Sequence, residues 1–223
     1  MLETLIKGGL LMIPLAICSV VGLSVLLERW MIFRANARID VPSLRAKVGH
    51  LLAEDRLDEA TTLCASTPGP VSATLLTGLQ TLRKARELQV DFAVQRAVVE
   101  KAMEDYTPHA IHVMELRLNW LATISNVAPL FGMTGTVTGM IRSFGSLGGA
   151  GSLDAGLVGA GISEALVATA SGLIIALASL IPYNGFMNRV AAVNLEIGEA
   201  AAELVQAMVL RHGRRLPAAS SRA

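Results

Sequence analysis

Glu164 is the acid best placed for proton chemistry, because it lies within a long run of apolar, small and hydroxyl-bearing residues. An ionisable group in a membrane helix is costly, so it suggests a function and a partner of opposite charge. Arg142, just past the outer end of the preceding apolar stretch, is the candidate for an ion pair with Glu164. Alternatively, Glu164 lies at the outer interface and meets water.

Thr136 and Thr169 are hydroxyl-bearing residues in two apolar stretches. Their hydroxyls can bond to another helix or line a pore, or they can bond back to their own helix. Thr169 does not share the helical face of Glu164, since successive residues turn by roughly 100°. No carboxylate or histidine lies deeper in these stretches, so any proton transfer requires a titrating group from a partner.

The same two stretches are rich in glycine. Gly135 and Gly139 form a GxxxG spacing, which allows two helix backbones to approach closely. Gly132 and Gly172 are predicted to serve the same helix packing.

Several kinds of site are not indicated. The sequence has no phosphate-binding glycine loop, nucleophile elbow or paired catalytic carboxylates, and its four histidines lack metal-ligand spacing. We therefore expect no enzyme, no metal and no cofactor other than protons as the coupling ion. Aromatic residues are 4% of the chain and form no stripe with basic residues, so nucleic acid is not an expected partner.

The composition and the uncharged runs predict an all-α membrane protein with three transmembrane helices. The chain is 52% hydrophobic and 17% charged, against about 25% charged in soluble domains, and a span needs roughly 20 apolar residues. The predicted segments are an N-terminus (1–7), a first span (8–30), a helical region (31–116), a second span (117–142), a loop (143–160), a third span (161–188) and a C-terminal helix and tail (189–223).

The distribution of Lys and Arg predicts the orientation. Of 19 cations, 12 lie between Arg29 and Arg117 and five from Arg189 onward. The positive-inside rule places both of these regions in the cytoplasm, with the N-terminus and the 143–160 loop in the periplasm.

The cytoplasmic region is predicted to be helical. Ser43 is the expected N-cap of a helix ending near Ala53, and Asp55 that of a helix ending near Ser66. Pro68-Gly69-Pro70 predicts a break, after which apolar residues from Val71 to Leu82 follow helical spacing. The periodicity continues from Asp91 towards the second span, and Pro108 is expected to kink or interrupt that helix.

Several segments resemble the MotA/TolQ/ExbB proton-channel family, closest to its ExbB and TolQ branches. The most specific are APLFGMTGTV at 128–137 and ISEALVATASGL at 162–173. The first span, closed by Glu28-Arg29, and the stretch from LDEA at 57–60 to PGPV at 68–71 resemble the family in the same order. One departure is Ala178, where the family often has a proline that here stands later, at Pro182.

This resemblance implies an inner-membrane motor subunit that assembles as a homopentamer. The pentamer would surround a dimer of a small single-span protein of the ExbD or TolR type, whose membrane aspartate titrates. Thr136 and Thr169 would be the pore hydroxyls that face the aspartate, and Glu164 the acid at the outer end of the pore. Proton flow would then drive rotation and energise an effector of the TonB or TolA type.

Other readings stay open. An ExbB-like role and a TolQ-like role in Tol-Pal envelope maintenance are not separated by the sequence. A MotA-like stator usually has four spans, and a transporter would need further spans or repeats. A non-conducting oligomeric scaffold would use the glycines for packing alone.

Overall fold

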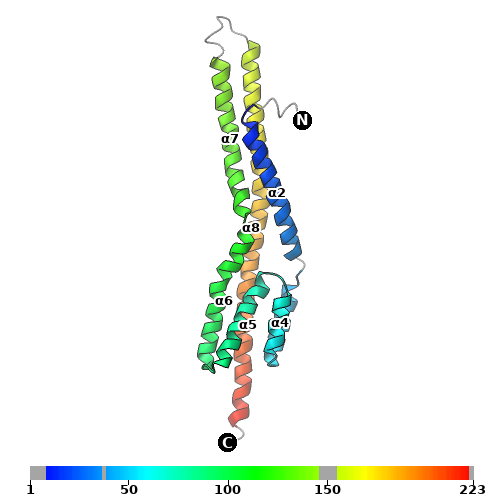
Figure 1. Cartoon of the computed structure of the whole chain (residues 1–223), viewed down its shortest axis with the longest axis vertical. Coiled ribbons are helices and arrows are strands. Elements are labelled where there is room, and N and C mark those ends of the chain that lie inside the picture. The colour runs from blue at the N-terminus through cyan, green and yellow to red at the C-terminus, as the bar shows by residue number, and fades with distance from the viewer. Residues whose placement is uncertain (1–8, 37–38, 146–154, 221–223) are drawn as a thin grey trace. The chain divides into compact units, whose positions relative to one another are not determined.

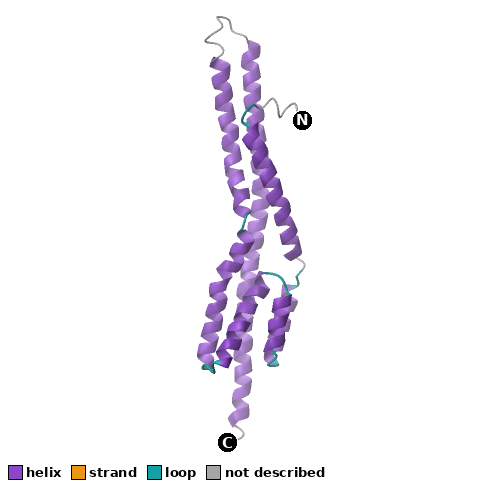
Figure 2. Cartoon of the chain, viewed as in Figure 1, coloured by secondary structure: helices purple, strands orange, loops and turns teal. Residues whose placement is uncertain are grey.

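The described residues form helices and no strands in a computed structural model of the chain (Figures 1 and 2). The structure describes residues 9–36, 39–145 and 155–220. The helices are α2 (Met12–Asn36), α3 (Val41–Ala53), α4 (Leu57–Ser66), α5 (Pro70–Glu87), α6 (Phe92–Glu115), α7 (Leu118–Gly145) and α8 (Ala155–Ser220).

The chain divides into two compact units. The first comprises residues 1–31 and 117–186, and the second comprises residues 32–116 and 187–223. Helix α8 is continuous over 66 residues and contributes to both. The predicted boundary between a third span and a C-terminal helix at 188–189 is therefore not a break in the helix, and neither is Pro182.

Among the described residues, two helices are long and apolar enough to cross a membrane: α2 and the Val158–Gly213 portion of α8. Helix α7 has 28 residues, a length of about 42 Å at 1.5 Å per residue. Its glycines, threonines and Asn126 dilute its hydropathy, because they replace the large aliphatic side chains of a simple span. The length of α7 suits a span, while its composition suits contact with protein.

The core of the first unit is small, and it is built where α2, α7 and α8 meet. Leu15 of α2 and Ala128 of α7 are completely buried, and Ala168 of α8 is nearly so. Gly22 permits α2 to approach closely, because an added Cβ would lie 3.4 Å from Ser179 Oγ and 3.5 Å from Ile124 Cδ1. Most large apolar side chains of these helices point outward instead, as expected for helices whose surroundings are lipid or another subunit.

The second unit has a larger core, formed by one face each of α3, α4, α5, α6 and α8. Its fully buried side chains follow helical spacing, as in Leu75, Leu79 and Leu82 on α5. Gly78 leaves room for Met103, whose Sδ would lie 2.6 Å from an added Cβ.

Two predicted helix caps were wrong. The side chain of Asp40, not that of Ser43, caps α3 by accepting a hydrogen bond from the Ser43 backbone N–H at 3.2 Å. Helix α4 begins after Arg56 and has no side-chain cap. Asp55 instead adopts a left-handed backbone conformation with φ of 67° in the α3–α4 turn, where its carboxylate pairs with Arg86 and Arg211.

The breaks around α5 and α6 depend on backbone conformation. Gly69 has φ of 122°, a conformation suited to glycine, and α5 begins at Pro70 as the sequence predicted. Asp91 caps α6 by accepting from the Ala93 N–H. Pro108 does not interrupt α6, which ends only at Glu115, before Arg117 with φ of 66°.

The predicted 143–160 loop is shortened from both sides. Helix α7 continues to Gly145 and α8 begins at Ala155. Residues 146–154, the middle of the predicted loop, lie outside the described part of the chain.

Candidate functional site

Small residues line the contact between α7 and α8. They recur every three or four positions, which keeps them on one face of each helix. On α7 the buried small residues are Ala128, Gly132, Gly135, Gly139 and Ser143, and on α8 those that meet them are Gly161, Ala165, Ala168 and Gly172.

The backbones of α7 and α8 approach closely at the centre of this stripe. A Cβ added to Gly132 would lie 3.0 Å from Thr169 Cα, and one added to Gly135 would lie 2.8 Å from Ala168 Cβ. Real Cβ atoms rarely make such short contacts, so alanine at either position would force the helices apart.

The same packing continues toward both ends of the stripe. An added Cβ on Gly172 would lie 2.5 Å from the Ala128 carbonyl oxygen, and one on Gly139 would lie 2.8 Å from Ala165 Cβ. Gly161 faces the buried Ser143, whose hydroxyl donates to the Gly139 carbonyl at 2.9 Å. The four glycines singled out from the sequence thus lie in one interface.

Thr169 makes a polar contact across the centre of this interface. Its Oγ1 donates to the carbonyl oxygen of Gly132 at 2.9 Å. The bond is possible because Gly132 has no side chain between the two backbones. Thr169 is half-buried, so its hydroxyl serves the α7–α8 contact within one subunit.

Thr136 behaves differently. Its hydroxyl donates to its own helix, at the Met133 carbonyl, with a distance of 2.7 Å. Thr134 and Thr138 also bond back to α7, and both are more exposed than the half-buried Thr136. The two hydroxyls have different partners and form no hydrogen bond with each other in the described part of the chain.

Glu164 lies near Arg142 and also against the start of α2. The distance from Arg142 Nη1 to Glu164 Oε1 is 3.4 Å. The backbone of Gly9 is close enough that an added Cβ would lie 1.8 Å from the same carboxylate oxygen. The acid therefore touches elements of all three helical segments of this unit.

Sequence reasoning overlooked Gly161, Ser143 and Gly9. The first two could have been found by extending the spacing of Gly139 and Ala165 by one more helical turn. Gly9 had no such signal, because its contact with Glu164 depends on how the chain enters α2.

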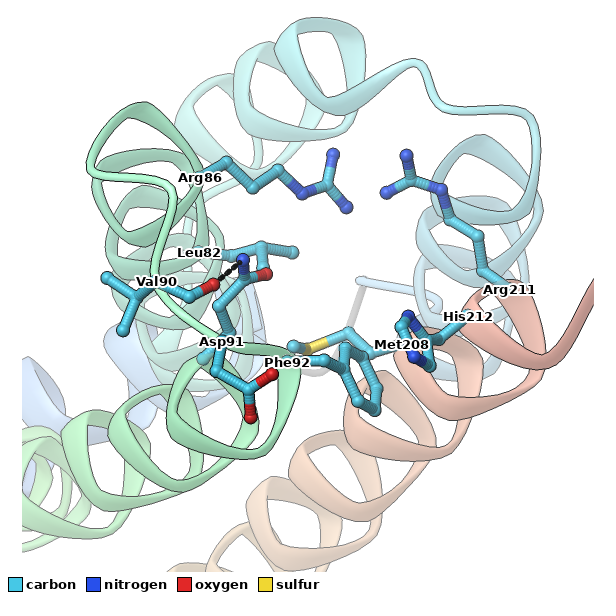
Figure 3. A pocket seen from close by; sticks show the side chains of 9 residues that line it. Leu82, Arg86, Val90, Asp91, Phe92, Met208, Arg211 and His212 are labelled. Carbon is cyan, nitrogen blue, oxygen red and sulfur yellow. Dashed lines mark hydrogen bonds between the residues drawn. The ribbon is translucent and has the colours of Figure 1, made fainter. Parts of the chain in front are cut away.

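A second cluster of charged groups lies in the second unit. Asp55 pairs with Arg86 at 3.0 Å and with Arg211. These arginines border a cavity of about 340 Å³, with Phe92 and His212 stacked on one wall at a centroid distance of 3.9 Å (Figure 3). Figure 3 shows the two guanidinium groups facing one another. Because both arginines pair with Asp55, the cluster links α5 and α8 to the α3–α4 turn.

The comparisons with known proteins identify the family of the chain. The sequence profile of the MotA/TolQ/ExbB proton channel family matches residues 69–199, which include Gly132, Glu164 and Thr169. This match covers more than half of the chain. The chain belongs to the MotA/TolQ/ExbB proton channel family. It is a membrane protein of a family of channel proteins, not enzymes.

Individual relatives come from two branches of this family. The chain is 35% identical to the Tol-Pal system protein TolQ of Haemophilus influenzae over 51% of each chain. It is 26% identical to the biopolymer transport protein ExbB of Pseudomonas putida over 88% of this chain and 58% of that one. It is 30% identical to a putative ExbB-like biopolymer transport protein of Synechocystis over 82% of this chain and 69% of that one. The chain thus spans 51% and 58% of the lengths of the first two relatives.

Proposed function

We propose that this protein is the stator-type subunit of a motor driven by the proton-motive force. Five copies surround a dimer of a small ExbD- or TolR-type protein, whose single membrane helix supplies the titrating aspartate. Family membership supports this proposal, and the observation that carries it is the pairing of α7 and α8 around a stripe that holds Thr169 but no acid at its centre.

The missing acid is the chemical reason for a partner. Residues 118–188 contain two carboxylates, Asp154 and Glu164, and both lie toward the outer end of the proposed spans. A chain with no titrating group near the membrane centre cannot relay a proton alone. A protonated aspartate of the partner could turn within an apolar pore at little cost, whereas its ionised form would be held beside a hydroxyl or water.

The proposal includes three membrane spans, with α7 as the second. The N-terminus and the 143–160 region face the periplasm, while the second unit and the C-terminus face the cytoplasm of the bacterial inner membrane. The cation distribution supports this topology. The glycines and threonines of α7 fit a helix that contacts α8 on one side and the partner on the other.

Within the family we favour an ExbB-like role that energises a TonB-type effector. The alignments to ExbB and ExbB-like proteins extend over 88% and 82% of this chain, against 51% for TolQ. The alternative is a TolQ-like subunit of a Tol-Pal system, since TolQ proteins also match this chain, at 35% and 37% identity. A non-conducting scaffold is the remaining alternative.

The architecture is tested by co-expressing the chain with the small single-span protein encoded beside it. Native mass spectrometry of the gently purified complex is expected to give five copies of this chain and two of the partner. The complex is then reconstituted into vesicles that contain a pH-sensitive dye, and a potassium diffusion potential drives proton entry. Flux in the wild-type complex supports the channel.

The controls separate the candidate functions. A partner whose membrane aspartate is replaced by asparagine should assemble in the same ratio without proton flux. A stable assembly that contains no partner, or no flux in an intact five-to-two complex, would favour the scaffold. Complementation of TonB-dependent uptake or of Tol-dependent envelope integrity, each in the matching deletion strain, decides between the two branches.

A further inference from the structure

We propose that Gly9 is a positioning residue, which seats the Glu164 carboxylate between Arg142 and the first turn of α2. We call this arrangement the outer clasp (Gly9, Arg142 and Glu164). This proposal rests on the proposed function, in which Glu164 is the acid at the outer end of the channel. The backbone of Gly9 would then set the position of that acid. The clasp would hold α2 against the two helices that form the channel wall.

The backbone of Gly9 has two features that require glycine. Its φ of +71° lies in the left-handed region, which side chains other than those of Asn and Asp adopt at a cost. A Cβ at this position would lie 1.8 Å from Glu164 Oε1 and 2.9 Å from Glu164 Cδ. Any side chain would therefore displace the carboxylate, even one that tolerates the backbone conformation.

The carboxylate lies where α2 begins. The Met12 N–H donates to the Gly9 carbonyl at 3.1 Å, and the Ile13 N–H donates to the Leu10 carbonyl at 3.2 Å. The first turn of a helix carries partial positive charge, because its amide groups are not all paired within the helix. An anion is favoured there, which gives Glu164 a stabilising partner besides Arg142.

The ion pair with Arg142 is by itself a weak tie. Its atoms are 3.4 Å apart, and the Arg142 side chain is 63% exposed while that of Glu164 is 33% exposed. Exposed pairs of this kind contribute little. The contact with Gly9 is therefore a second tie for the carboxylate.

The clasp acts on the segment of α8 that also packs on α7. Ala165, the residue after Glu164, is buried against Gly139. One turn of α8 is thus held by α7 on one side and by the start of α2 on the other. Thr169 lies five residues after Glu164, roughly 7.5 Å along the helix axis. Displacing Glu164 would therefore disturb the channel wall near Thr169.

The test is a double-mutant cycle between Gly9→Asn and Glu164→Ala in the purified complex. Asparagine tolerates the left-handed backbone, so Gly9→Asn adds a Cβ with little backbone strain. The readout is hydrogen–deuterium exchange of the peptide that contains Gly9 to Leu15, followed by mass spectrometry. Gly9→Asn should accelerate exchange there by about tenfold or more, since displacing the carboxylate removes its contact with the first turn. In the Glu164→Ala background the same change should have a much smaller effect.

Gly159→Ala is the matched control, because this α8 glycine has nothing within 4 Å of an added Cβ. It should leave the exchange unchanged. Equal acceleration by Gly9→Asn in both backgrounds, or none in either, would overturn the clasp. If Gly9→Asn prevents assembly, its recovery by Glu164→Ala is the supporting result, and failure to recover is the contradicting one. Exchange is measured without proton flux, so a wild-type complex that conducts no protons would count against the proposed function and not against the clasp.

Discussion

The Thr169 hydroxyl donates to the Gly132 carbonyl at 2.9 Å, across a helix interface lined largely by glycine and alanine. This bond gives the proposed pore hydroxyl a fixed place within one subunit. It also means that Thr169 has a structural role to be separated from a role in proton transfer.

Replacing Thr169 tests the two roles together. Thr169→Val keeps the shape but removes the donor, so motor output and proton flux are expected to be lost. Stability should fall by only about 0.5–1 kcal/mol, since hydrogen bonds between membrane helices are worth little on average. Proton flux into vesicles and denaturation of the solubilised complex are the two measurements.

Thr169→Ser and Thr134→Val are the controls for this experiment. Serine restores a hydroxyl at the same place and should recover flux. Thr134 is exposed and bonds only to the Leu130 carbonyl of its own helix at 2.8 Å, so its replacement should leave flux nearly unchanged. Full activity in Thr169→Val would remove Thr169 from the proton pathway.

The glycine stripe predicts a compensating pair. Gly135→Ala should destabilise the unit by about 1–3 kcal/mol, the usual range for overpacking, because its Cβ would lie 2.8 Å from Ala168 Cβ. Ala168→Gly in the same chain should recover most of that loss. Thermal unfolding in detergent measures both.

Gly145→Ala is the control for the stripe. Nothing lies within 4 Å of an added Cβ at Gly145, and the residue is exposed at the end of α7. It should leave unfolding unchanged or raise its temperature slightly. A Gly135→Ala protein as stable as this control would contradict the close approach of α7 and α8.

The sequence predicted the helical breaks that depend on backbone chemistry. Pro68-Gly69-Pro70 ends one helix and starts another, since proline cannot donate and Gly69 takes a positive φ. Pro108 was misjudged. The loss of one hydrogen bond did not stop α6, whose buried Val99, Met103 and Ala110 lie on both sides of the proline and hold the helix against its unit.

Contacts between residues far apart in the chain could not be predicted from the sequence. Periodicity in glycine was visible because it repeats along one helix, so Gly135 and Gly139 could be assigned to packing without a structure. The partner of Asp55 could not be predicted, since Arg86 and Arg211 are 31 and 156 positions away. The contact of Gly9 with Glu164 is of the same kind.

Asp55 is expected to be a structural anion of the second unit. Asp55→Asn retains a residue that tolerates φ of 67° and removes only the charge. Arg211 and Arg86 are largely buried, with side chains 11% and 26% exposed, so they lose their common carboxylate at a cost of about 1–3 kcal/mol. Chemical denaturation followed by circular dichroism measures the change.

Asp58→Asn is the control for Asp55. Asp58 is 84% exposed and its partner Arg83 is 56% exposed, so its loss should change stability by less than about 0.5 kcal/mol. Equal effects of the two substitutions would show that the Asp55 pairs contribute no more than a surface ion pair.

Cys64 is expected to be unreactive in the folded protein and to make stability fall at high pH. Burial in the core of the second unit raises the pKa of its thiol from 9.0 to about 11. Because the folded state holds the proton more tightly than the unfolded chain, this contribution to stability is complete below pH 9. It is lost as the pH rises from about 9 to about 11.

In a Cys18→Ser background, maleimide labelling at pH 8 should occur only after denaturation. The fall in stability above pH 9 should be shallower in Cys64→Ala than in the parent, and rapid labelling of the native protein at pH 8 would contradict the buried thiol.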